Sequence, residues 1–249
     1  MPPYFKMGNN TAGKAWLIHM WRIVDLGLLP YMAALDLQHR MVQARYEGNL
    51  GEDTVLLLEH PSVYTLGRNG GLENLKASPE LLKEMGVPVV RTMRGGDITY
   101  HGPGQIIAYP IIDLRTDKIG VFDYVSGLEE VMIRVAQDYG IEAQRSALNH
   151  GVWIEGKKVG SIGLAIRHGI AFHGLALNVD LSLTYFSWIN ACGLKDISMT
   201  SLKQAGVKNI DIKLVKNRIV SHMEEVFGVK ASEWKSGDFL REFPLILQE

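Results

Sequence analysis

The chain has 249 residues, 47% of them hydrophobic and 21% charged, and a formal net charge of −1. This is the composition of an ordinary globular protein, and the near-neutral charge excludes a whole-chain attraction to nucleic acid or to an anionic membrane surface. No apolar run approaches the roughly 20 residues that span a bilayer. The single cysteine, Cys192, excludes an internal disulfide or a multi-cysteine metal site and fits a reducing compartment, so we expect a cytoplasmic protein.

Three segments of different character are predicted along the chain. Residues 1–19 begin polar and irregular and end in a short apolar patch, without the layout of a signal peptide. We expect them to be an N-terminal extension, disordered or foreign to the native chain. Residues 20–230 are expected to form one domain, and residues 231–249 a C-terminal tail that packs on this domain or trails from it. The sequence leaves open whether a small C-terminal subdomain begins after about Leu181.

The spacing of apolar, capping and turn residues predicts helices and strands in groups. Helices are expected at 30–46, 79–85, 121–139 and 214–227. Strands are expected at 54–58, 63–66, 87–91, 105–112, 152–154, 159–166 and 172–179. Because strands come in adjacent groups with helices between the groups, the pattern favours an α+β (α/β) fold, a single domain with a central mixed β-sheet flanked by helices.

The densest signal is the glycine-rich stretch from Arg94 to Gln105, which lies between two predicted strands and is either a ligand-binding stretch or a long irregular connection. Its glycines let the backbone approach a ligand closely, and successive N–H groups there could hold a carbonyl, carboxylate or phosphate. Alternatively, the glycines satisfy turn geometry alone. The stretch has neither the Gly-Lys-Ser/Thr of a phosphate-binding loop nor the Gly-x-Gly-x-x-Gly of a dinucleotide site.

Three histidines lie in or near these segments. His101 is either a general acid or base or a structural residue bonded to a nearby carbonyl. His60, beside Pro61, is expected to brace a turn, and His173 is either a polar core residue or part of a pocket. No histidine has the spacing of a metal-binding motif, so no metal is expected.

A pair of lysines, Lys157 and Lys158, follows a hairpin turn predicted at residues 155–156. Side chains alternate between the faces of a strand, so one lysine can enter a pocket while the other stays in water. Two solvated lysines are the alternative. Gly160 and Gly163 favour the pocket, because glycine inside a strand often marks close approach by a ligand or another backbone. Cys192, taken alone, is either a buried core residue or a nucleophile.

Four stretches, in this order, resemble one family. They are Leu58–Pro61 with Tyr64–Gly67, Arg94–Gln105, Gly156–Gly163, and His173–Val179 followed by Asn190–Gly193. Together they are similar to the lipoyl(octanoyl) transferases, the octanoyl-[acyl-carrier-protein]:protein N-octanoyltransferases, over about residues 20–230. The last stretch holds the single cysteine at the matching position.

The resemblance implies a fold like that of the biotin and lipoate ligases and a catalytic pair at Cys192 and Lys158. It implies that an octanoyl group moves to the acceptor lysine of lipoyl domains through a cysteine thioester, without ATP, as a step of protein lipoylation. The pair suits this chemistry because a thiolate attacks and a nearby amine can take its proton. Ala191 departs from the family, which often has proline there, and this puts the rigidity of the cysteine loop in question. The substrate-binding residues implied by motif position are Arg94, Gly95, Gly96, Asp97, Ile98, Thr99, Tyr100, His101, Ser161, Ile162, Gly163, Gly174, Leu175 and Ala176.

The implied partners are octanoyl-acyl carrier protein as the donor and the lipoyl domains of 2-oxoacid dehydrogenase and glycine cleavage proteins as acceptors. No cofactor, nucleic acid or membrane is implied, and we expect a monomer. Three alternatives stay open: an ATP-dependent lipoate or biotin ligase, a thioesterase in which water replaces the acceptor lysine, and an acyl-binding protein without catalysis. Basic residues considered for a face toward the acidic carrier protein are Lys76, Arg91, Arg94, Arg145 and Arg167.

Overall fold

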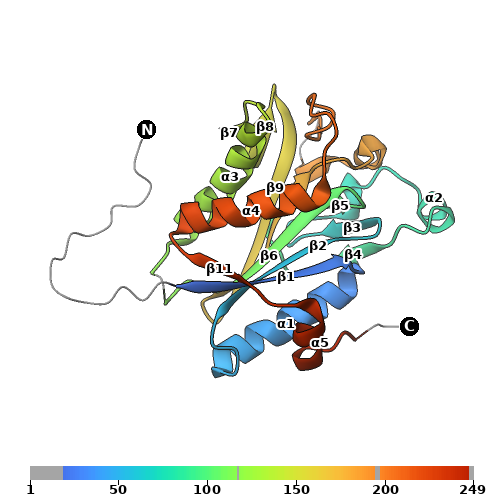
Figure 1. Ribbon diagram of the computed structural model, residues 1–249. Coiled ribbons are helices and arrows are strands. Elements are labelled where there is room, and N and C mark those ends of the chain that lie inside the picture. The colour runs from blue at the N-terminus through green and yellow to red at the C-terminus, as the bar shows by residue number, and fades with distance from the viewer. Residues whose placement is uncertain (1–18, 117, 194–196, 247–249) are drawn as a thin grey trace.

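An eight-stranded mixed sheet forms the centre of the computed structural model, which describes residues 19–116, 118–193 and 197–246 (Figure 1). The strands lie in the order β11-β1-β2-β6-β10-β9-β8-β7. β1 runs parallel to β2 and β11, and the other neighbours are antiparallel. The mixed sheet predicted from the sequence is therefore confirmed. Its strands are β1 Met20–Leu28, β2 Asp53–Glu59, β6 Gln105–Asp113, β7 Gln144–Ser146, β8 Asn149–Ile154, β9 Lys157–Arg167, β10 Ile170–Asn178 and β11 Lys230–Glu233.

Helices cover both faces of this sheet. α3 (Val121–Asp138) and α4 (Ile212–Phe227) lie on one face, and α1 (Tyr31–Glu47) and α5 (Ser236–Glu242) lie on the other (Figure 1). The central strand β6 is buried along its whole length and contributes side chains to the hydrophobic cores on both faces of the sheet. Its Ile106 packs in the core with α3 and α4, whereas Ile107 packs in the core with α1, because successive strand residues point to opposite faces.

A second, three-stranded sheet lies beside the main sheet and carries the glycine-rich stretch. Its order is β4 (Val89–Arg91), β3 (Val63–Leu66) and β5 (Ile98–His101), and α2 (Pro79–Glu84) precedes β4. β5 pairs antiparallel with β3. The alternative of a long irregular connection is therefore wrong for Ile98–His101, because these four residues form the edge strand of a sheet.

Turn and capping signals explain why the predicted elements begin and end where they do. α1 stops at Gly48, which has φ 78°, and Ser78 accepts a hydrogen bond from the Leu81 N–H at the start of α2. The hairpin between β8 and β9 turns at Glu155 and Gly156, with φ 47° and 74°. Five α-helices and strands of the described residues were not predicted: β1, β5, β7, β11 and α5.

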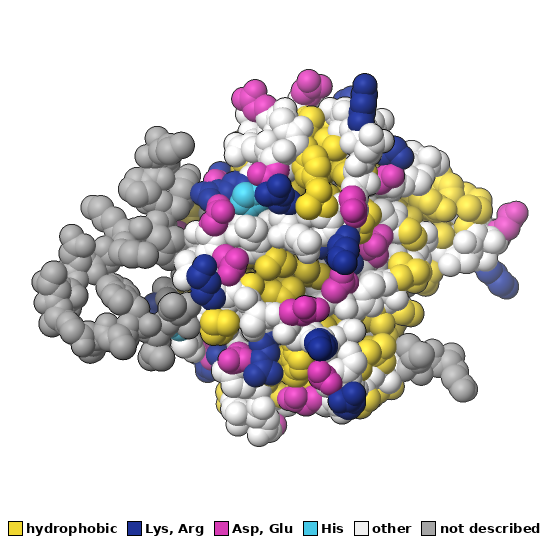
Figure 2. Space-filling model, viewed as in Figure 1, with side chains coloured by type: hydrophobic (Ala, Val, Ile, Leu, Met, Phe, Trp, Pro, Cys, Tyr) yellow, Lys and Arg dark blue, Asp and Glu magenta, His cyan; other side chains and the backbone are white. Residues whose placement is uncertain are grey.

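The residues after Leu181 rejoin the main body. α4 packs against α3, β11 pairs with β1, and Phe239 of α5 is fully buried. Residues 197–246 therefore do not form a separate subdomain. Residues 1–18 of the expected N-terminal extension lie outside the described residues. The face that carries α4 mixes basic and acidic side chains, as the near-neutral net charge suggests (Figure 2). No described helix is long and apolar enough to cross a membrane.

Candidate active site

Cys192 lies in a strained turn. The turn is the short 3-10 helix Ala191–Gly193, and Cys192 has φ 60°, in the left-handed region that residues other than glycine rarely adopt. Asn190 donates its backbone N–H to the carbonyl oxygen of Asn74 at 2.8 Å, and Asn74 Nδ2 donates to Asp97 Oδ2 at 2.9 Å. These bonds tie the cysteine turn to the glycine-rich stretch. The thiol is partly exposed, and strain of this kind often accompanies function.

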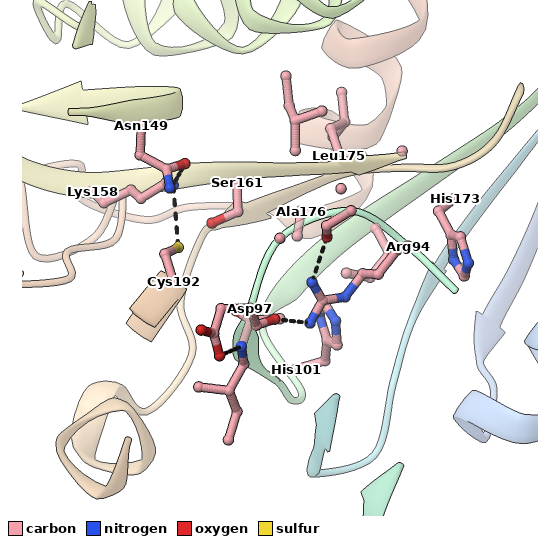
Figure 3. A pocket seen from close by; sticks show the side chains of 18 of the residues that line it. Arg94, Asp97, His101, Asn149, Lys158, Ser161, His173, Leu175, Ala176 and Cys192 are labelled. Carbon is pink, nitrogen blue, oxygen red and sulfur yellow. Dashed lines mark hydrogen bonds between the residues drawn. The ribbon is translucent and has the colours of Figure 1, made fainter. Parts of the chain in front are cut away.

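Lys158 reaches the sulfur from β9. Its Nζ lies 3.4 Å from Cys192 Sγ, 3.0 Å from Asn149 Oδ1 and 2.8 Å from the carbonyl oxygen of His150 (Figure 3). The Lys158 side chain is 1% exposed, whereas the neighbouring Lys157 is exposed. The predicted alternation of the two lysines is confirmed.

The neighbours of the Lys158 amine satisfy it in either protonation state. An ammonium has three N–H groups, which it can donate to the two oxygens and to the sulfur. A neutral amine donates to the same two oxygens and keeps its lone pair for the thiol of Cys192. Because Asn149 and His150 occupy two directions in both states, the proton that can move is the one shared with sulfur. A nucleophile and its base are arranged in this way in covalent catalysis.

A pocket with about 560 Å³ of empty space, its open mouth included, begins at this pair. Figure 3 shows Cys192 and Lys158 at one end and His173 at the other, with Arg94 and Ala176 between them. The pocket is lined by Arg94, Gly95, Gly96, Asp97, Ile98, Thr99, His101, Ile107, Tyr109, Asn149, Lys158, Ser161, Ile162, Gly163, His173, Gly174, Leu175, Ala176 and Cys192. The structure thus brings together every predicted site residue except Tyr100.

Tyr100 faces away from the pocket. Its neighbours on β5, Thr99 and His101, line the pocket, and side chains alternate along a strand. The Tyr100 ring packs in the core below the small sheet, where it stacks on Tyr185 with 4.6 Å between ring centroids. Its hydroxyl bonds to that of Ser62 at 2.9 Å. Tyr100 is therefore the one predicted site residue that does not line this pocket.

Arg94 braces the glycine-rich stretch from inside. Its side chain is buried, and Nη2 donates to the carbonyl oxygens of Thr65 at 2.6 Å and of Asp97 at 2.8 Å. Nη1 donates to the carbonyl oxygen of Gly95 at 2.9 Å. Burial lowers the pKa of the Arg94 guanidinium, which nevertheless stays charged as arginine does in proteins. The suggestion that Arg94 belongs to an exposed basic face is therefore wrong.

Two strand glycines admit close neighbours, as predicted, and these neighbours are protein groups. A Cβ on Gly160 would lie 2.5 Å from Met132 Sδ, and a Cβ on Gly163 would lie 3.0 Å from Arg94 Cδ. Helix α3 and the arginine can therefore both press against β9. This close packing fixes the strand that carries Lys158.

Three pocket-lining residues were missed by sequence reasoning: Ile107, Tyr109 and Asn149. Ile107 and Tyr109 lie on the same face of β6 by strand alternation, but the sequence does not indicate that this face opens into a pocket. Asn149 carries no motif signal. It reaches Lys158 because β8 pairs with β9, which is a tertiary relationship. His173, which the sequence left open, lines the pocket.

Three buried histidines lie in this region: His101 and His173 line the pocket, and the His60 ring lies 5.7 Å from that of His101 between centroids. Burial lowers the pKa of His60 to about 4 and that of His173 to about 3, and it holds the pKa of His101 well below its usual value. All three are therefore neutral near pH 7. His60 braces its turn, as predicted, through a 2.7 Å bond to the carbonyl oxygen of Leu29. In the described part of the chain, no three His, Cys, Asp or Glu side chains gather closely enough to hold a metal ion.

The chain matches a known protein family along most of its length. Residues 30–224 match the family described as lipoyl protein ligase A/B catalytic domain. An octanoyltransferase of Desulfotalea psychrophila is 48% identical over 83% of this chain and 93% of its own length. Another, of Syntrophobacter fumaroxidans, is 46% identical over 82% of this chain and 90% of its own length.

Solved structures show the same fold at low identity. Lipoate-protein ligase A bound with ATP superposes with a TM-score of 0.72 at 16% identity, covering 90% of this chain and 94% of that one. A lipoate protein ligase of Thermoplasma acidophilum gives a TM-score of 0.68, also at 16% identity, covering 90% and 92%. The predicted resemblance to lipoate ligase folds is confirmed. By family match and by identity to its relatives, the chain belongs to the lipoyl protein ligase A/B catalytic-domain family and, within it, to the octanoyltransferases.

Proposed function

We propose that this acyltransferase moves an octanoyl group from octanoyl-acyl carrier protein to the acceptor lysine of a lipoyl domain, with Cys192 as nucleophile and Lys158 as its proton partner. Relatives named octanoyltransferase, 40% to 48% identical to this chain, support the reaction. The observation that supports the residue assignment best is the 3.4 Å distance between Lys158 Nζ and Cys192 Sγ at the end of a pocket.

Two displacements complete the proposed reaction. In the first, the Cys192 thiolate attacks the carbonyl carbon of the donor thioester, the bond to the carrier sulfur breaks, and the Lys158 ammonium gives its proton to the leaving thiolate. In the second, the amine of the acceptor lysine attacks the enzyme thioester, and the carbon–sulfur bond to Cys192 breaks. Lys158 takes the proton that the attacking nitrogen loses. The first exchange is nearly balanced and the amide product is more stable, so no ATP is required.

The walls of the pocket suit an aliphatic chain. Ile107, Ile162, Leu175 and Ala176 supply apolar side chains beyond the reactive pair. Burying the roughly six methylenes of an octanoyl tail contributes about 5 kcal/mol at about 0.8 kcal/mol each. One methylene more or less changes binding by roughly 1–3 kcal/mol. We therefore expect a preference for chain length and some transfer of neighbouring lengths.

We propose the lipoyl domains of 2-oxoacid dehydrogenase and glycine cleavage proteins as acceptors, in the cytoplasm. Of the basic residues considered for contact with the acidic carrier protein, Lys76, Arg91 and Arg167 are exposed. Arg145 is instead paired with two carboxylates, those of Glu129 and Glu130. The three exposed residues are the ones we propose for the carrier contact.

Intact-mass measurement tests the proposal. After incubation with octanoyl-acyl carrier protein, the wild-type chain should gain the mass of one octanoyl group, and adding a lipoyl domain should move that mass to the domain. Cys192→Ser should show neither event at a comparable rate. Full transfer by Cys192→Ser would contradict the nucleophile.

The same assay separates the alternatives. Free octanoate appearing as fast without a lipoyl domain as with one would indicate a thioesterase. Transfer that requires free octanoate and ATP would indicate a ligase. A wild-type chain that binds the donor and never gains mass would indicate an acyl-binding protein.

A further inference from the structure

A single peptide group joins Lys158 to a buried carboxylate. The carbonyl oxygen of His150 accepts from Lys158 Nζ at 2.8 Å. The N–H of the same peptide unit belongs to Gly151, and it donates to Glu129 Oε1 at 2.8 Å. Glu129 lies on α3 and is 4% exposed. A continuous chain therefore runs from the sulfur of Cys192 through the lysine amine and the peptide to the carboxylate.

The backbone at Gly151 is pressed against the lysine in a way that only glycine allows. Gly151 has φ 127°, and a Cβ there would lie 2.3 Å from the carbonyl oxygen of Gly160 and 2.8 Å from Lys158 Cε. Every side chain is thus excluded from the point where the peptide, the lysine stem and β9 meet. This close approach holds the peptide in line between Lys158 and Glu129.

The physical effect of this chain is polarisation. A carboxylate that accepts from a peptide N–H draws electron density toward the carbonyl oxygen, which then accepts more strongly from the group on its other side. Because the chain is buried, little water screens the interaction. The ammonium form of Lys158 gains from this, and an ammonium beside Cys192 favours the thiolate.

Glu129 shares its guanidinium partner, Arg145, with a second carboxylate, that of Glu130. Glu129 Oε2 accepts from Arg145 Nε at 3.1 Å, and Arg145 also donates to Glu130 at 2.9 Å. Glu130 in turn pairs with Arg134, which pairs with Glu225. The His150 imidazole, 3.4 Å from Glu129 Oε1, is largely exposed.

We propose that Glu129 is a positioning residue that acts through the His150–Gly151 peptide to hold Lys158 as an ammonium directed at Cys192. This inference rests on the proposed function, because it assigns Glu129 to the same reactive pair. Glu129 touches neither substrate nor sulfur, and its contribution is to the balance between the thiol–amine and thiolate–ammonium forms.

Alkylation of Cys192 by iodoacetamide tests the inference without any acyl substrate, and the chain has only one cysteine to react. In Glu129→Gln the rate near pH 7 should fall by about tenfold, the size expected for removing one buried charge across a peptide. Near pH 10 the rate should match wild type, because the thiol then ionises without help. Glu130→Gln is the matched control: it removes a carboxylate that also pairs with Arg145 and does not touch the peptide, and its profile should stay within about twofold of wild type.

Two results would overturn the inference. One is a Glu129→Gln alkylation profile like that of wild type. The other is an alkylation rate lowered by the same factor at every pH, which would mean that Glu129 has only a structural role. If Glu129→Gln does not fold, the amide proton of Gly151 gives a second reading in the wild-type protein. Its NMR resonance should lie far downfield and move upfield in Lys158→Met, because the peptide then loses its cation. No movement would also reject the inference.

The outcome is separable from the proposed function. If Glu129→Gln alters alkylation and the wild-type chain never forms an octanoyl thioester, the hydrogen-bonded chain stands and the substrate assignment fails. If the thioester forms and Glu129→Gln has the wild-type alkylation profile, only the role of Glu129 fails.

Discussion

Two adjacent lysines provide the sharpest comparison at the scale of single residues. Lys158 is buried and bonded to Asn149, His150 and the Cys192 sulfur, whereas Lys157 is exposed. Lys158→Ala should lower octanoyl transfer to a lipoyl domain by about 10²–10⁴-fold, the range for losing a positioned acid or base. Lys157→Ala should leave the rate within about twofold. Comparing single-turnover rates of the two variants checks this, and a larger loss at Lys157 would reassign the proton partner.

The sequence could predict that contrast because it depends on a local rule. Alternation after the hairpin turn sends one lysine in and one out, and the glycines beyond it showed that this strand is closely approached. The partners of Lys158 could not be predicted. Asn149 comes from the neighbouring strand and Glu129 from α3, and their positions depend on how the hairpin packs against that helix.

At the scale of secondary-structure elements, the packing of α3 on β9 depends on Gly160. A methyl group there would lie 2.5 Å from Met132 Sδ. Gly160→Ala should therefore lower the free energy of unfolding by about 1–3 kcal/mol, the usual cost of overpacking, with part of the clash relieved by the flexible methionine. Gly51→Ala is the matched control, because no atom lies within 4 Å of a Cβ at that position. Urea unfolding of both variants makes the measurement, and equal free energies of unfolding would contradict the packing argument.

The short strands β5 and β11 were missed for a shared physical reason. β11 reads Lys-Ala-Ser-Glu, with no apolar alternation, and it is a strand because Met20 to Ile23 of β1 present an edge to it. β5 lies among glycines and becomes a strand by pairing with β3. Long helices such as α3, with 18 residues, could be predicted, because the periodic spacing of their apolar residues is visible in the sequence alone. Short edge strands depend on a partner strand, which for β11 lies about 200 residues away in the sequence.

At the scale of the whole molecule, the pocket lies where the small sheet meets the main sheet. β5 and the Arg94 stretch supply one wall, β9 and β10 supply the other, and the cysteine turn closes one end. Arg94 ties the walls together, since it bonds to Thr65 of β3 and packs against Gly163 of β9. Sequence motifs could place most residues of this site by resemblance. They could not show that His101 and His173 line it as neutral rings, with the buried His60 ring beside His101.

Those histidines predict acid lability. Burial lowers the pKa of His60 to about 4 and of His173 to about 3, and the pKa of His101 is also lowered. An unfolded histidine has a pKa near 6.5, so below that pH the unfolded chain binds protons that the folded chain refuses. The free energy of unfolding should be highest above pH 6.5 and fall as the pH drops toward 4. The slope should reach about 4 kcal/mol per pH unit if all three histidines take up a proton on unfolding.

Urea unfolding at a series of pH values from about 7 to about 5 measures this slope, and His173→Asn provides the control. Asparagine does not titrate and tolerates the left-handed backbone of this position, where φ is 58°. His173 Nδ1 also has no hydrogen-bond partner among the described residues, so its replacement breaks no bond at that atom. In the variant, the slope of the free energy of unfolding against pH should be smaller than in wild type by the contribution of one proton, about 1.4 kcal/mol per pH unit. A wild-type stability that is flat across this range would mean that the folded protein admits protons to its buried histidines.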